Sequence, residues 1–186
     1  MASHPYIGIS DGAYMTSRDR LDFHIWGEAF VRPGQEQENW TDRNNMAAWG
    51  MLQLSPEKLS LYYLRHYQHP TAHLARMTVR TDGFVSAHAG SIVGTLTTKP
   101  LVFEGKNLVI NFATSAGSQI RVELQDEQGK PVPGYEKDNC PAIYGDEIEH
   151  VVSWKKGSDL SGLQNKPVKI KFELIDADLY SVRFRN

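Results

Sequence analysis

The two halves of this 186-residue chain carry unequal amounts of predicted β-structure. Period-two runs of apolar residues, bounded by Gly, Pro, Asn and Asp, recur throughout, while helix signals are nearly absent. Residues 6–80 supply a few short strands, whereas residues 82–186 supply enough strands for a complete domain. We therefore predict an all-β protein with a boundary at Asp82-Gly83, which divides it into residues 1–81 and 82–186.

The first half is predicted to be a β-meander that resembles a single propeller blade. The expected strands are 13–17, 23–26, 47–52, 59–67 and 73–80, with a long polar loop from Pro33 to Asn45. Loops of this length in compact domains are usually functional or disordered, and Trp40 favours order. One blade cannot close a propeller, and unpaired strand edges invite pairing with other protein.

The second half is predicted to be an antiparallel, jelly-roll-like β-sandwich. The expected strands are 96–103, 108–114, 119–124, 148–154, 168–174 and 180–185. Turns are expected at Ala116-Gly117-Ser118 and Asp176-Ala177-Asp178, because small and acidic residues tolerate turn backbone. Alternation along these strands predicts a core of Ile110, Phe112, Ile120, Val122, Val152, Trp154, Ile170, Phe172 and Phe184.

Composition excludes several classes of function. The 20 Lys and Arg residues balance 22 Asp and Glu residues, so we expect neither nucleic acid nor a membrane as partner. No long apolar run and no signal-peptide pattern occurs, which leaves the cellular compartment open. The single cysteine, Cys140, excludes an internal disulfide framework and is interpreted as a semi-buried thiol.

Several segments resemble one bacterial enzyme family. In the first half they are Tyr14-Met15-Thr16-Ser17-Arg18-Asp19, Glu28-Ala29-Phe30-Val31-Arg32-Pro33-Gly34, Glu38-Asn39-Trp40 and Arg43-Asn44-Asn45. In the second half they are Arg80-Thr81-Asp82-Gly83-Phe84-Val85-Ser86, Leu96-Thr97-Thr98-Lys99-Pro100-Leu101, Gly145-Asp146-Glu147-Ile148-Glu149 and Asp176-Ala177-Asp178-Leu179-Tyr180. The first set resembles the last blade of the five-bladed propeller in family 32-like glycoside hydrolases, and the second resembles the β-sandwich that follows it.

The resemblance implies a carbohydrate-related role without assigning a catalytic residue. The family's nucleophile, transition-state-stabilising aspartate and acid/base glutamate lie on earlier blades, and no stretch here matches their motifs. We therefore expect a non-catalytic, carbohydrate-binding or structural end of a glycoside hydrolase. Two alternatives stay open: a small stand-alone glycoside hydrolase that uses Glu28 and Asp42, and a module that assembles through exposed strand edges.

The predicted carbohydrate contacts cluster in and near the polar loop. They are Trp40, Asp42, Arg43, Asn44, Asn45 and His66, with Trp49 beside them. Trp stacks on the C–H face of a sugar, while Asn, Asp and Arg pair with its hydroxyls. In the alternative interpretation Trp49 belongs to the core and Arg43-Asn44-Asn45 satisfies the loop backbone.

Three histidines surround one predicted turn, and hairpin geometry places His66 beside His73 with His69 at the end. Zinc prefers a closed tetrahedral shell, and no fourth ligand is evident. The sequence therefore predicts no metal site and no cofactor. The expected partners are an oligo- or polysaccharide, and either the remainder of a propeller or a second copy of the chain.

Overall fold

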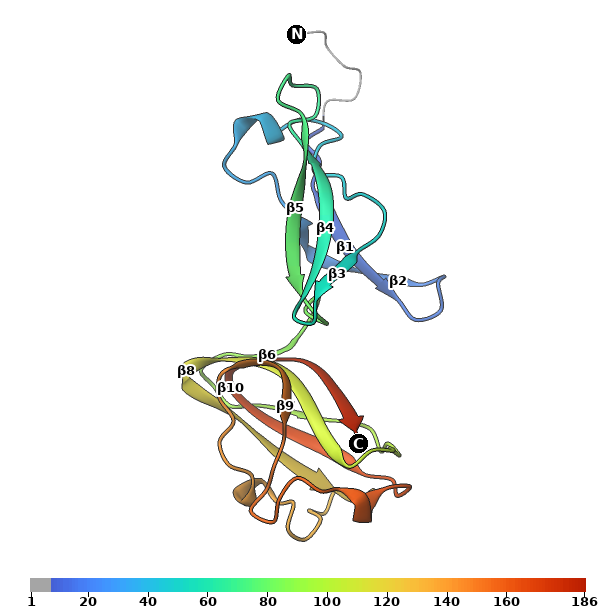
Figure 1. Ribbon diagram of the computed structural model, residues 1–186, viewed down its shortest axis with the longest axis vertical. Helices are drawn as coiled ribbons and strands as arrows, with labels where there is room; N and C mark the ends of the chain where they lie inside the picture. The colour runs from blue at the N-terminus through green and yellow to red at the C-terminus, as the bar shows by residue number, and fades with distance from the viewer. Residues whose placement is uncertain (1–7) are drawn as a thin grey trace. The chain divides into compact units, whose positions relative to one another are not determined.

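The computed structural model describes residues 8–186 and divides the chain into two compact units, the first ending at Thr81 and the second beginning at Asp82 (Figure 1). The start of the first predicted unit, residues 1–7, lies outside the described residues. The protein is all-β, as the sequence predicts, with 51% of residues in strands. Within residues 8–186 the helices are three-residue 3-10 turns, and none is long and apolar enough to cross a membrane.

The first unit contains two separate antiparallel sheets. Strands β1 (Gly12–Ser17) and β2 (Phe23–Val31) form a hairpin. Strands β3 (Leu52–Ser55), β4 (Lys58–Arg65) and β5 (His73–Arg80) form the predicted meander, in which β4 lies in the centre. The meander therefore holds three strands, and the hairpin is a sheet of its own rather than its continuation.

Local chemistry explains both the hairpin turn and the start of β3. The Asp19 carboxylate accepts backbone N–H groups from Leu21 and Asp22, each at 2.9 Å, which closes the β1–β2 turn. The strand predicted from residue 47 is wrong, because Ala47 makes only an isolated bridge to β4 and Gly50 adopts a φ of +90°. The left-handed backbone at Gly50 interrupts the extended chain, so β3 begins later.

The second unit is a curled five-stranded antiparallel sheet. Its strands are β6 (Ala87–Ala89), β7 (Gly94–Thr97), β8 (Asn107–Gln125), β9 (Asp146–Val151) and β10 (Lys169–Arg185). β10 pairs with β6 and β7 along one side and with β8 along the other, while β9 pairs with the outer side of β8. The sheet is a half-barrel, consistent with the predicted β-sandwich.

The predicted turns at 116–118 and 176–178 are wrong. β8 and β10 run through these segments as continuous strands and pair from Lys169↔Gln125 to Arg185↔Asn107. The register shifts between Ile175 and Ala177, where Asp176 has a φ of +41°. A bulge of this kind bends a strand without ending it, so the polar residues mark the place where the long ladder curls.

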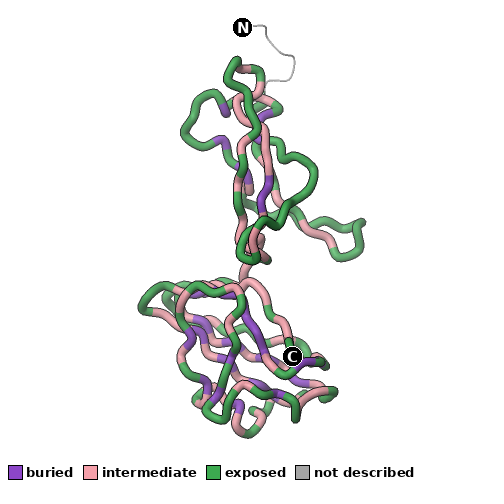
Figure 2. The backbone as a smooth tube through the Cα atoms, in the orientation of Figure 1, coloured by how far each residue is buried: buried purple, intermediate pink, exposed green. Residues whose placement is uncertain are grey.

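The predicted core of the second unit is confirmed. Ile110, Phe112, Ile120, Val122, Val152, Ile170 and Phe172 are fully buried, and Trp154 is nearly so. The Trp154 indole N–H donates to the Val122 carbonyl at 3.0 Å, which satisfies the one polar atom of that side chain. Phe184 is partly buried and stacks on Phe103 with ring centroids 3.9 Å apart. In Figure 2 stretches of the tube coloured as buried recur through this unit.

The first unit has a much smaller core. Within residues 8–81 the buried apolar side chains are those of Val31, Pro33 and Leu61. Most of its tube in Figure 2 is coloured as exposed or intermediate. Three buried asparagines, described below, supply much of what holds its long loop in place.

Gly105 offers a test of packing in the second unit. Its φ is +104°, and a Cβ added there would lie 2.9 Å from the backbone nitrogen of Arg185. We expect Gly105→Ala to lower the free energy of unfolding by about 2 kcal/mol or more, from left-handed strain and overpacking. The measurement is urea unfolding followed by Trp154 fluorescence. Gly162→Ala is the control, because its added Cβ meets no atom within 4 Å. Equal midpoints for both variants would contradict the prediction.

Candidate functional site

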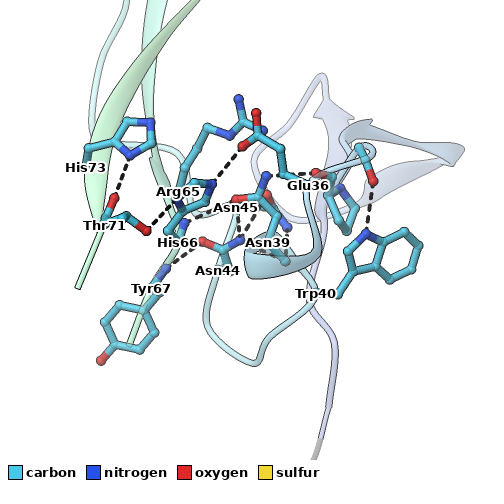
Figure 3. A network of polar contacts seen from close by, with 12 residues as sticks. Glu36, Asn39, Trp40, Asn44, Asn45, Arg65, His66, Tyr67, Thr71 and His73 are labelled. Atoms are coloured by element: carbon cyan, nitrogen blue, oxygen red, sulfur yellow. Dashed lines mark hydrogen bonds and ion pairs between the residues drawn. The ribbon is translucent and has the colours of Figure 1, made fainter. Parts of the chain in front are cut away.

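The candidate site lies at one end of the first unit, where two segments meet. The first is the polar loop, defined as residues 33–45, which contains the 3-10 turn Gln37–Asn39. The second is the His66 turn, defined as residues 66–72, which links β4 to β5. Figure 3 shows their side chains converging in a network of polar contacts. The Thr41 hydroxyl of the loop also lies 3.4 Å from the Tyr67 carbonyl of the turn.

Asn39 is fully buried and joins the two segments. Its Nδ2 donates to the Pro33 carbonyl at 3.0 Å, which closes the start of the polar loop. Its Oδ1 accepts the His66 backbone N–H at 3.1 Å, which fixes the start of the turn. A buried amide with its donor and acceptor both used is rigid, and losing either partner leaves an unsatisfied polar group.

Asn44 and Asn45 are each only 1% exposed. Asn44 Nδ2 donates to the Asn39 carbonyl at 2.8 Å, and Asn44 Oδ1 accepts the Tyr67 N–H at 3.2 Å. Asn45 Nδ2 donates to the Ser10 carbonyl at 2.8 Å. The prediction that these amides contact sugar hydroxyls is therefore corrected, because burial and backbone pairing occupy them. The contacts of Asn44 and Asn45 agree with the alternative interpretation, in which these side chains satisfy backbone groups.

Four non-glycine residues at this end have left-handed backbone. Arg43 and Asn45 in the polar loop have φ values of +56° and +60°, and His66 and Gln68 in the turn have values of +55° and +68°. Each such residue costs on the order of 1–3 kcal/mol, and the strain persists only where surrounding contacts over-determine the backbone. The buried asparagines supply these contacts. Strain concentrated in this way is typical of functional sites.

Glu36 ties the polar loop to the end of β4. Its Oε2 lies 2.8 Å from the Arg65 guanidinium and 2.7 Å from His66 Nε2. His66 Nε2 donates to the carboxylate, and its Nδ1 lies 2.9 Å from the Thr71 hydroxyl. The His66 hydrogen bond lowers the pKa of the Glu36 carboxyl from its ordinary value of 4.5, and attraction to Arg65 adds to the effect.

This lowered pKa predicts a pH-dependent loop. Because the folded pKa of Glu36 lies below the unfolded one, its stabilisation is present above the unfolded pKa and is lost as pH falls through the folded pKa. We expect Glu36→Gln to reduce hydrogen-exchange protection of the His66 amide at neutral pH, and the difference from the wild type to vanish in acid. Glu38→Gln, in the same loop, is the control. A loss that persists unchanged in acid would contradict the prediction.

Asp42 and Glu28 have different surroundings. The Asp42 side chain is 15% exposed, accepts from Gln68 Nε2 at 3.1 Å and lies 3.9 Å from Arg43 Nε. The Arg43 side chain is 54% exposed and is accessible to a ligand. Glu28 is highly exposed on β2 and pairs with Arg32 at 3.2 Å. Each carboxylate therefore faces a cation of its own segment.

Trp40 presents a fixed aromatic surface. Its side chain is 51% exposed, and its indole N–H donates to the Gly34 carbonyl at 2.9 Å, which holds the ring against the loop (Figure 3). Trp49 is fully exposed, so its interpretation as a core residue is wrong. It precedes Gly50, where the chain leaves its pairing with β4.

His66 and His73 lie side by side, as the hairpin predicts, with ring centroids 5.0 Å apart in an edge-on arrangement. His73 Nδ1 donates to the Thr71 carbonyl at 2.8 Å, and His66 is engaged by Glu36 and Thr71. In the described part of the chain no group of three His, Cys, Asp or Glu side chains is placed to hold a metal ion. These histidines build the turn.

Sequence reasoning missed Glu36, Asn39 and Arg65 as parts of the site. Nothing in the spacing of Glu36 and Arg65 marks them, because β3 and the rest of β4 lie between them in the chain and their contact depends on the tertiary fold. Asn39 differs, since it lies in a long loop and Asn side chains commonly hydrogen-bond the backbone of loops and turns.

No protein-family model, no curated protein and no solved structure matches this chain.

Proposed function

We propose that this chain is the non-catalytic, carbohydrate-binding end of a glycoside hydrolase of the family 32-like propeller type. One observation carries the proposal: Trp40 and Arg43 are exposed on a loop that buried amides and ion pairs hold in one conformation. The protein loses little conformational entropy when a ligand binds to such a surface, because the loop is already ordered. Weak stacking and hydrogen bonds therefore suffice for recognition.

The chemistry of the site suits a sugar. The Trp40 ring offers an apolar face for the C–H groups of a pyranose or furanose. The Arg43 guanidinium and the Asp42 carboxylate offer donors and acceptors for hydroxyl groups on the same loop. His66 is largely enclosed by its partners, so we assign it to the support of the loop rather than to ligand contact.

The first unit also supports the proposal that further protein completes it. Met15 and Ile25 are cross-strand partners on one face of the hairpin, and both are exposed, as is Trp26 on the opposite face. An isolated two-stranded hairpin is marginally stable at best, and exposed apolar surface of this extent marks an interaction site. Neighbouring sheets of a propeller would cover these faces.

Binding to a panel of soluble glycans (inulin, levan, mannan, xylan and β-glucan) tests the proposed function. We expect one of them to bind in affinity electrophoresis without release of reducing sugar. Trp40→Ala should weaken binding at least about tenfold, equivalent to about 1.4 kcal/mol, since a stacking platform is lost. Trp49→Ala, which removes an exposed tryptophan outside the polar loop, is the control. Equal losses in both variants, or binding to none of the glycans, would contradict the proposal.

Self-association is the second candidate function, and the open edges of the meander favour it. β3 and β5 lie at the two edges of their sheet, and Leu74 on β5 is exposed. Exposed edges of this kind template pairing with another chain. Analytical ultracentrifugation separates this candidate from the first: a stable dimer that dissociates in Leu74→Lys and ignores glycans would support it.

A further inference from the structure

A groove lies beside Trp40, next to the polar network described above. Its volume is about 350 Å³, and its walls include Asp11, Arg32, Pro33, Gly34 and Trp40. These residues come from the segment before β1, the segment after β2 and the polar loop. Ligand pockets in proteins occupy roughly 300–1,000 Å³, so this groove suits one small ring rather than an extended ligand.

The walls of the groove are held in place by contacts already described. Pro33 is buried, and its carbonyl accepts the Asn39 amide at 3.0 Å. The Gly34 carbonyl accepts the Trp40 indole N–H at 2.9 Å, so the ring is fixed and its polar atom is satisfied. An arriving ligand therefore meets the apolar face of the ring, beside the polar side chains of Asp11 and Arg32.

Charge decides which sugars the groove favours. Glu28 Oε2 lies 3.2 Å from the Arg32 guanidinium, so the positive charge of Arg32 is already balanced. Asp11 is the carboxylate in the lining, and Glu28 itself lies outside it, so the charge of Asp11 remains. A uronic or sialic acid would meet net negative charge there, whereas a neutral sugar offers hydroxyl groups that both donate and accept.

We infer that this groove is a subsite for one neutral sugar ring, which stacks on Trp40 while its hydroxyls pair with Asp11 and Arg32. The inference rests on the proposed function and gives it a ligand class and two further contact residues. The Asp11 carboxylate accepts sugar O–H groups, and the guanidinium of Arg32 donates to sugar oxygens. Neither residue belongs to the amide network that supports the polar loop.

The test follows the indole N–H signals of the full chain by NMR, with the Trp40 signal assigned from Trp40→Phe. The neutral probes are the methyl glycosides of fructofuranose, glucopyranose, galactopyranose and mannopyranose, and the anionic probe is glucuronic acid. We expect at least one neutral glycoside to shift the Trp40 signal saturably, with glucuronic acid binding more weakly. Arg32→Gln and Asp11→Asn should each raise Kd about tenfold, while Arg76→Gln, the same change at an exposed arginine of β5, should not.

The outcomes separate this inference from the proposed function. If a polysaccharide of the panel binds but no glycoside shifts the Trp40 signal, the subsite is wrong and the proposed function stands. Tighter binding of glucuronic acid, or equal affinities in Arg32→Gln and Arg76→Gln, would also overturn the subsite. Binding of neither polysaccharides nor glycosides would overturn both. Unchanged backbone amide spectra of the variants show that they are folded, and Arg32→Lys provides a more conservative change at the same position.

Discussion

Asn44→Ala will destabilise the polar loop and weaken glycan binding together. The substitution removes the acceptor of the Tyr67 N–H and the donor to the Asn39 carbonyl, at a position that is 1% exposed. A buried polar group left unsatisfied costs about 1–3 kcal/mol, so we expect the first unit to lose about 2–4 kcal/mol. Few other contacts compensate, because its buried apolar side chains within residues 8–81 are those of Val31, Pro33 and Leu61.

The loss is measured by urea unfolding followed by far-ultraviolet circular dichroism, and by the affinity for the glycan that the wild type binds. Gln35→Ala, an exposed change in the same loop, is the control and should stay within about 0.5 kcal/mol of the wild type. If Asn44→Ala unfolds at the wild-type urea concentration, the amide network does not hold the loop. If it loses stability but keeps its affinity, Trp40 and Arg43 do not depend on that network for their placement.

Phe172→Ala is expected to have the largest effect on the second unit. Phe172 is fully buried on β10, where Leu96 of β7 and Val122 of β8 are its cross-strand partners. Truncating a buried phenylalanine costs about 3–5 kcal/mol, from lost apolar burial and from the cavity that remains. A loss of this size is a large fraction of the stability of a small domain.

Trp154 reports this change selectively. It is the one tryptophan of residues 82–186 and is buried, whereas Trp26, Trp40 and Trp49 belong to the first unit and are exposed. We expect the blue-shifted part of the emission to disappear at a lower urea concentration in Phe172→Ala. Phe23→Ala, which truncates an exposed phenylalanine of the first unit, should leave the Trp154 transition in place. A Trp154 transition that moves equally in both variants would contradict this assignment.

The sequence predicts the core of the second unit well because alternation along a half-buried strand is a local property. On β10, Ile170 and Phe172 are fully buried and are separated by the less buried Lys171. The curl of the sheet is not local in this sense. Asp176-Ala177-Asp178 has the composition of a turn, yet it lies inside β10, and only the partner strand decides between a turn and a bulge.

The sequence predicts part of the candidate site, because residue type shows which side chains can contact a ligand but does not show which of them are buried. Trp40 and Arg43 are exposed, as a ligand contact must be. Asn44 and Asn45 carry the same chemistry but are buried, and the residue type alone does not distinguish an amide that binds a sugar from one that binds the backbone. The ion pair of Glu36 with Arg65 joins positions far apart in the chain, so no local pattern reveals it.

The position of β10 in its sheet affects how the protein is made. β10 lies between β8 on one side and β6 and β7 on the other, yet it is the last of these strands to leave the ribosome. Until Arg185 has been synthesised, three strands lack their partner, and chains grow at roughly 5–20 residues per second. The second unit therefore completes its sheet only after its last strand emerges, and until then the strand edges that β10 will cover are open to pairing with other chains.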